Sequence, residues 1–174
     1  MIGKLLTTLA DPTLHSLDAD EGIGVVVPHR AQRADLQNAV PELTLKDPIT
    51  GKTIRSAVDT VERFQGGERT VIMVGATESD RSYLVASPDF LLDPRRLTVA
   101  LSRAKEKMIL VASRSIFDLF SADDELFANA QLWKNLLRRT CTVPLWEGAI
   151  DGTGVKVWGN AQCVTPPDME LLND

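Results

Sequence analysis

Cysteine and histidine are scarce in this sequence, and their placement excludes two classes of site. The 174 residues include two cysteines, Cys141 and Cys163, and two histidines, His15 and His29. No Cys-x-x-Cys pair occurs, and no histidine stands at metal-ligand spacing from a cysteine or from the other histidine. We therefore expect reduced cysteines without a structural role, and no bound metal.

Long hydrophobic runs are absent as well. No stretch of 18 apolar residues occurs, and the apolar part of the opening MIGKLLTTLADPTL is too short for a signal peptide or a membrane span. The sequence therefore predicts no membrane partner and, by default, a cytoplasmic location. A hydrophobic share of 44% and a charged share of 25% are ordinary for a globular protein, and the length suits one domain.

A surplus of positive charge is also missing, since 19 Lys and Arg stand against 24 Asp and Glu, a net charge of −5. Attraction to phosphates dominates nucleic-acid affinity, so this balance argues against a free-standing nucleic-acid binder. The basic residues nevertheless cluster at Arg30 and Arg33, at Arg63 and Arg69, and from Arg95 to Lys107. Any contact with a nucleic-acid strand is therefore expected to be local, and weak on its own.

The segment Gly51-Lys52-Thr53 has the last three residues of the phosphate-binding loop Gly-x-x-x-x-Gly-Lys-[Ser/Thr]. That loop needs a glycine at position 46, where Lys46 stands. It also follows a buried strand and opens a helix, whereas here a polar segment with prolines precedes and a β-branched segment follows. We interpret the segment as a surface turn that leads into a strand.

Short apolar segments alternate with amphipathic ones along the chain, which is typical of an α/β domain with a parallel sheet and helices on both faces. Residues 77–92 have no clear period and predict an exposed, mobile loop, and residues 149–174 predict a poorly ordered tail. Helices are expected at 4–10, 29–40, 94–105 and 131–139, and strands at 23–27, 54–61, 70–76, 107–112 and 140–146.

The helix expected at 94–105 has the clearest start signal. Asp93 is the predicted N-cap and Pro94 the first helical residue. An apolar stripe that would pack on a sheet follows at helical spacing, formed by Leu97, Leu101, Ala104 and Met108.

Ligands of open parallel sheets bind outside the carboxyl ends of the strands. The residues expected there include Pro28, His29 and Arg33 after the first strand, Gly66, Gly67 and Glu68 after the second, and Arg96 and Arg103 on the helix that follows. Gathered on one edge, such a set would suit an anion such as a triphosphate. Each residue also has a plain alternative as a solvated helix residue or a turn residue, and the residue types alone leave both interpretations open.

Three segments carry a family resemblance: VVVPHRAQRADL, VDTVERFQGGERTVIMV and LLDPRRLTVALSRAKEKMILVAS. They resemble, in order and spacing, motifs IV, V and VI of superfamily 1 helicases, and most of all the 1B branch that includes the up-frameshift helicase of nonsense-mediated decay. The similarity covers about residues 22–148. It implies an α/β fold of the RecA-like, P-loop NTPase type, in which residues 1–148 form the second motor domain, called 2A.

The resemblance also implies roles around ATP. Arg33 of motif IV and Arg103 of motif VI would reach the γ-phosphate as arginine fingers. Glu68 would bind the ribose, Gly66 would let the loop come close, and Gln65 and Arg96 would support the site.

Four further residues match family positions near the nucleic-acid backbone. They are Pro28, His29, Asp59 and Thr60. The resemblance thus implies single-stranded DNA or RNA as a partner, with Thr60 able to donate a hydrogen bond to a phosphate.

The Walker A, Asp-Glu-x-x and motif III sequences of these helicases do not appear. The resemblance places them, with the Mg²⁺ ligands for ATP, on a first motor domain, 1A, of the same polypeptide. We expect an ATP-dependent helicase from which residues 1–174, as an excised domain, hydrolyse no ATP alone. The alternative is a free-standing or degenerate 2A-like module that binds or regulates without motor activity.

Overall fold

The computed structural model describes residues 1–15, 17–60, 67–86, 91 and 93–160. The chain forms two compact units, residues 1–130 and the part from Gln131 onward. The helix α6 (Asp124–Thr140) crosses the boundary between them.

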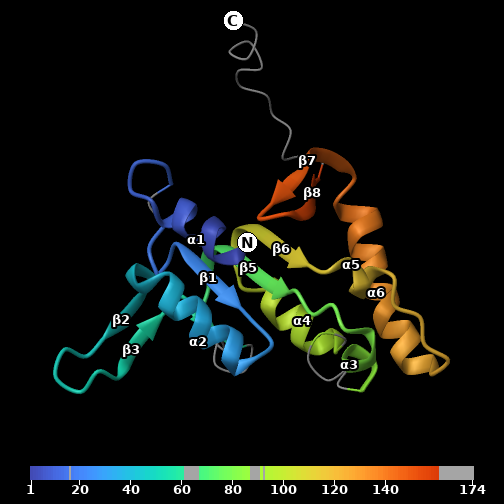
Figure 1. The fold of residues 1–174 in the computed structure, drawn as a ribbon, viewed down its shortest axis with the longest axis horizontal. Coiled ribbons are helices and arrows are strands. Elements are labelled where there is room, and N and C mark those ends of the chain that lie inside the picture. The colour runs from blue at the N-terminus through green and yellow to red at the C-terminus, as the bar shows by residue number, and fades with distance from the viewer. Residues whose placement is uncertain (16, 61–66, 87–90, 92, 161–174) are drawn as a thin grey trace, which may run out of the picture. The chain divides into compact units, whose positions relative to one another are not determined.

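The elements alternate as the sequence predicts (Figure 1). The other helices are α1 (Ile2–Ala10), α2 (Arg30–Ala39), the 3₁₀ helix η1 (Pro41–Leu43), α3 (Arg81–Ala86), α4 (Pro94–Leu101) and α5 (Arg114–Phe117). The strands are β1 (Ile23–Val26), β2 (Thr44–Lys46), β3 (Thr53–Ser56), β4 (Val58–Asp59), β5 (Arg69–Ala76), β6 (Ala104–Ala112), β7 (Val143–Ile150) and β8 (Thr153–Gly159). No helix in the described ranges is long and apolar enough to cross a membrane.

A four-stranded parallel sheet in the order β4-β1-β5-β6 forms the centre of the first unit. Figure 1 shows β1, β5 and β6 side by side with their arrowheads pointing the same way. All four residues of β1 are buried, as expected for a strand covered on both faces. The predicted parallel α/β fold is therefore confirmed.

Successive residues of these strands supply two separate layers of core, because side chains alternate between the faces of a sheet. On one face Val25 and Met73 pack with Leu6 of α1 and Leu36 of α2. On the other face Val26, Ile72 and Val74 pack with Ala100 of α4. Helices therefore cover both faces, as the sequence predicts.

The strand expected at 54–61 is divided in two. Thr53–Ser56 forms β3, which pairs antiparallel with β2, and only Val58–Asp59 joins the parallel sheet as β4. Side-chain burial explains the division, because Thr53 and Arg55 are exposed whereas Ala57 and Val58 are fully buried. The turn before β3 contains Gly51 at φ 67°, so the interpretation of Gly51-Lys52-Thr53 as a turn into a strand is confirmed.

The helix expected at 94–105 ends earlier, at Leu101, and the strand expected from Lys107 begins at Ala104. The Arg69 N–H donates to the Arg103 carbonyl over 3.0 Å. The helix therefore ends here, because the backbone from Arg103 onward pairs with β5. Two residues of the predicted helical stripe, Ala104 and Met108, lie on β6 as a result.

The segment expected to be a loop at 77–92 contains the helix α3. The Asp80 carboxylate accepts hydrogen bonds from the N–H groups of Ser82 and Tyr83, which caps the start of the helix. Leu84 is buried and fixes α3 to the rest of its unit.

In the second unit, the strand expected at 140–146 is β7, which pairs antiparallel with β8 and not with the parallel sheet. The domain boundary expected after residue 148 falls inside β7. The part of the predicted tail up to Gly159 is therefore ordered as the second half of a hairpin.

We predict that Ile72→Ala lowers the free energy of unfolding by about 2–5 kcal/mol, because it leaves a cavity in the fully buried layer beneath α4. Ile54→Ala is the matched control, since Ile54 is 61% exposed on β3 and should change stability by no more than about 0.5 kcal/mol. Urea denaturation followed by circular dichroism measures both, and equal effects of the two variants would contradict the assigned core.

The turn that enters β1 is held by the Asp18 carboxylate. Its Oδ1 accepts hydrogen bonds from the N–H groups of Asp20, Glu21 and Gly22 at 2.7, 2.9 and 3.2 Å. These bonds, first that of Glu21 and then that of Asp20, hold the pKa of Asp18 below its usual range.

A carboxyl group with a lowered pKa in the folded state stabilises the fold above its unfolded pKa, about 3.9 for Asp, and loses this contribution as the pH falls through the folded pKa. We therefore predict that Asp18→Asn is less stable than the wild type at pH 7, and that the gap narrows below about pH 4. Urea midpoints between pH 7 and pH 3 measure the gap, and a constant gap would refute the assignment.

Candidate functional site

Arg33 and Asp59 form an ion pair at the carboxyl ends of β1 and β4. Arg33 lies in the first turn of α2, and its Nη1 is 3.1 Å from Oδ1 of Asp59, the last residue of β4. The two side chains are only 23% and 24% exposed. The same Oδ1 accepts the backbone N–H of Thr60 over 2.8 Å. Asp59 thus connects the helix after β1 to Thr60, the residue that follows β4.

Gln37 makes a second tie between the same helix and strand. It lies one turn beyond Arg33 on α2, and its Nε2 donates to Ser56 Oγ and to the Val58 carbonyl, both at 3.0 Å. A cleft of about 250 Å³ lies beside these contacts. It is lined by Arg33, Gln37, Thr53, Ile54, Arg55, Ser56 and Asp59.

Pro28 and His29 link β1 to α2 and are half-buried. The His29 ring meets the Tyr83 ring edge to face, with 5.6 Å between centroids. His29 Nε2 is buried and has no hydrogen-bond partner among the described residues. Tyr83 was missed because its segment was expected to be a loop, although the sequence Ser79-Asp80-Arg81-Ser82 offers a helix cap.

A second group lies at the amino ends of β5 and β6. Glu68 is exposed just before β5, and Arg103 comes one residue before β6. The Arg103 Nε is buried without a hydrogen-bond partner in the described part of the chain. The candidate residues were expected on one edge of the sheet, but they lie at two opposite edges.

The connection made by α4 explains the separation. This helix leads from the carboxyl end of β5 to the amino end of β6, so its last turn and Arg103 return to the amino ends. Asp59 is level with Val74 through Val26, and Arg69 is level with Ala104. At about 3.3 Å per residue, the five positions from Arg69 to Val74 set the two groups roughly 17 Å apart along the strands.

Arg96 lies in the first turn of α4, where its Nε is 3.8 Å from Oδ2 of the N-cap residue Asp93. Asp93 Oδ1 accepts the Arg95 N–H over 2.8 Å, which confirms the predicted cap. Gln65 and Gly66 lie outside the described residues, in the segment that connects β4 to β5.

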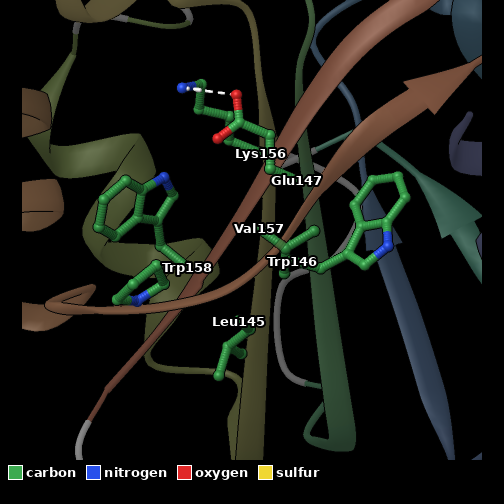
Figure 2. A pocket seen from close by; sticks show the side chains of 7 residues that line it. Leu145, Trp146, Glu147, Lys156, Val157 and Trp158 are labelled. Carbon is green, nitrogen blue, oxygen red and sulfur yellow. Dashed lines mark ion pairs between the residues drawn. The ribbon is translucent and has the colours of Figure 1, made fainter.

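The β7–β8 hairpin carries a separate cavity of about 240 Å³ within the second unit. Figure 2 shows the rings of Trp146 and Trp158 turned away from each other, with Lys156 paired to Glu147 at 2.8 Å. Neither tryptophan was a predicted site residue. In the described ranges no group of three or more His, Cys, Asp or Glu side chains is arranged to hold a metal ion.

The family model described as "AAA domain" matches residues 1–115, which is more than half of the chain. The chain belongs to the AAA domain family.

Named relatives refine this assignment. The chain is 36% identical over 101 residues to the putative helicase MOV-10 of Gallus gallus, a match to 54% of this chain and 10% of the relative. It is 29% identical over 163 residues to the helicase sen1 of Schizosaccharomyces pombe, which covers 87% of this chain and 8% of the relative. It is 31% identical over 118 residues to the regulator of nonsense transcripts 1 homolog of Drosophila melanogaster. This match covers 67% of this chain and 9% of the relative.

These relatives confirm the predicted motor domain of a superfamily 1 helicase. The chain spans about a tenth of the length of the curated relatives it matches.

We predict that Asp93→Ala lowers the free energy of unfolding by about 1 kcal/mol, because it removes the side-chain cap of α4. Asp93→Asn keeps an oxygen that can accept the Arg95 N–H, so it should lose clearly less. Urea denaturation of both variants tests this, and equal losses would show that the ion pair with Arg96 matters more than the cap.

Proposed function

We propose that this motor domain works in an ATP-dependent helicase, facing a domain 1A of the same polypeptide and holding part of a single strand of DNA or RNA. The observation that carries the proposal is the presence of two arginines, Arg33 and Arg103, at the motif IV and VI positions, each with a buried Nε that lacks a described partner. Unmet buried donors are costly, so both sites favour an anionic acceptor.

ATP with Mg²⁺ would supply the phosphoryl group that is transferred, and its Mg²⁺ ligands are expected on domain 1A. In this chain, Arg33 and Arg103 would offset the charge of that group as arginine fingers, a contribution of about 10³–10⁵ in rate. Because they lie at opposite ends of the parallel strands, the two guanidinium groups would approach the nucleotide from different sides. The exposed carboxylate of Glu68 would accept hydrogen bonds from the ribose. Gly66, Gln65 and Arg96 keep their proposed supporting roles.

The nucleic-acid strand is assigned to the carboxyl ends of β1 and β4. Pro28 and His29 lie on the turn after β1, and Thr60 follows β4. A hydroxyl and backbone groups position a phosphate backbone without reading its sequence, which suits an enzyme that moves along any strand. The net charge of −5 implies that this domain alone grips the strand weakly.

We predict that Arg103→Ala, in the natural protein that carries this chain, lowers ATP turnover by about 10³-fold or more while ATP affinity changes less than about tenfold. Arg114→Ala is the matched control, because Arg114 is 87% exposed on α5, where its Nε lies 3.3 Å from the Asp118 carboxylate. Arg103→Lys should recover little activity, since an ammonium lacks the planar fork of a guanidinium.

Steady-state ATPase assays with a saturating oligonucleotide, together with nucleotide binding by fluorescence, separate turnover from affinity. Wild-type turnover in Arg103→Ala would refute the finger assignment. A natural protein that hydrolyses no ATP would instead favour the alternative, a 2A-like module without motor activity.

A further inference from the structure

We propose that Asp59 is a positioning residue that holds Arg33, and that its carboxylate couples the nucleotide site to the nucleic-acid contact at Thr60. The inference rests on the proposed function and changes one assignment within it. The family resemblance puts Asp59 beside the nucleic acid, whereas the structure points its carboxylate at Arg33.

The charge and contacts of Asp59 argue against a direct contact with nucleic acid. A carboxylate repels a phosphodiester, and Oδ1 is already used twice, by Arg33 Nη1 at 3.1 Å and by the Thr60 N–H at 2.8 Å. The pair is about three-quarters buried, so salt screens it less than it screens a surface pair. Asp59 is therefore suited to binding Arg33 and not to contacting a nucleic-acid strand.

The backbone around the pair is fixed on both sides. Asp59 accepts the Val27 N–H through its carbonyl over 3.1 Å, which places it in the parallel ladder. Arg33 is held along α2 by Gln37, one turn away, which binds Ser56 and Val58. The ion pair thus joins two rigid elements, which is how a side chain is held ready for a reacting group.

One anchored Nη leaves a guanidinium with further donors. Arginine has five N–H groups, and the Nε of Arg33 is buried without a described partner. Asp59 can therefore fix the orientation of Arg33 while other N–H groups of the side chain remain for a phosphate oxygen.

The shared oxygen also links two sites. Any movement of Arg33 toward a nucleotide weakens its hydrogen bond to Oδ1 of Asp59. The same oxygen accepts the N–H of Thr60, the proposed strand contact, so the position of Thr60 is affected as well. By linkage, binding of nucleotide and binding of strand then affect each other equally, by a factor typically about 5–150. Loss of the carboxylate should reduce this factor.

A double-mutant cycle on ATP turnover in the natural protein tests the positioning role. Asp59→Asn should lower kcat by up to about 100-fold with little change in KM, because it misplaces Arg33 without removing it. In an Arg33→Ala background the same substitution should cost less than about twofold. Asp118→Asn is the matched control, since Asp118 accepts from Arg114 on the exposed face of α5.

The outcomes separate the inference from the proposed function. If Arg33→Ala slows turnover and Asp59→Asn slows it further by its full factor, Asp59 acts on its own and the positioning role is overturned. If the Arg33→Ala variant hydrolyses ATP at the wild-type rate, the proposed role of Arg33 as an arginine finger is wrong, whatever Asp59 does. Asp59→Glu, which keeps the charge, should recover part of the activity and guards against a variant that only misfolds.

A second readout needs no activity. In ¹⁵N NMR spectra of the 174-residue chain without nucleotide, the Nε–H signal of Arg33 is identified by its loss in Arg33→Lys. Asp59→Asn should shift and broaden this signal, because the guanidinium loses its anchor, and Asp118→Asn should leave it in place. An unchanged Arg33 signal in Asp59→Asn would overturn the inference.

Discussion

Burial of β1 on both faces is the constraint from which the rest of the first unit follows. A buried strand must pair its backbone on both edges, because unpaired N–H and C=O groups are costly away from water. On one side, β1 pairs with β5. On the other side of β1, the Val25 N–H donates to the Ala57 carbonyl and the N–H of Val27, just beyond the strand, donates to the Asp59 carbonyl. This pairing fixes the end of β4 beside the start of α2. The proximity of Asp59 and Arg33 is therefore a consequence of the backbone hydrogen bonds that the buried strand β1 requires.

The sequence predicts the elements that depend on local patterns and misses those that depend on distant partners. The apolar strands and the Asp93 cap are visible locally and are confirmed. The end of α4 is not visible locally, because Ala104 and Met108 also fit the apolar stripe of a helix. Only their pairing with β5 makes them part of a strand. The β7–β8 hairpin had a local signal that was overlooked, since Asp151 at φ 51° and Gly152 at φ 78° form an Asp-Gly turn between its strands.

The candidate site shows the same division. Motif spacing singles out Arg33, Asp59 and Arg103 from the sequence, but it contains no information on which of them meet. Arg33 and Asp59 are 26 positions apart, and their contact exists only because β4 pairs with β1. Arg103 was expected on the same edge, and the return of α4 across the sheet puts it at the other end. A residue's role can be suggested by its motif, whereas its partner is decided by topology.

Charge has a different meaning once these contacts are known. The net charge of −5 first suggested weak nucleic-acid binding, and the arginine clusters suggested local exceptions. Arg33 is not such an exception, because Asp59 neutralises its charge within the fold. Under the proposed function, this carboxylate keeps the guanidinium from acting as a general phosphate anchor and reserves its remaining donors for one acceptor. A weak and uncharged grip at Thr60 is then an advantage for a motor, since a strand held by few charges can be released at every step.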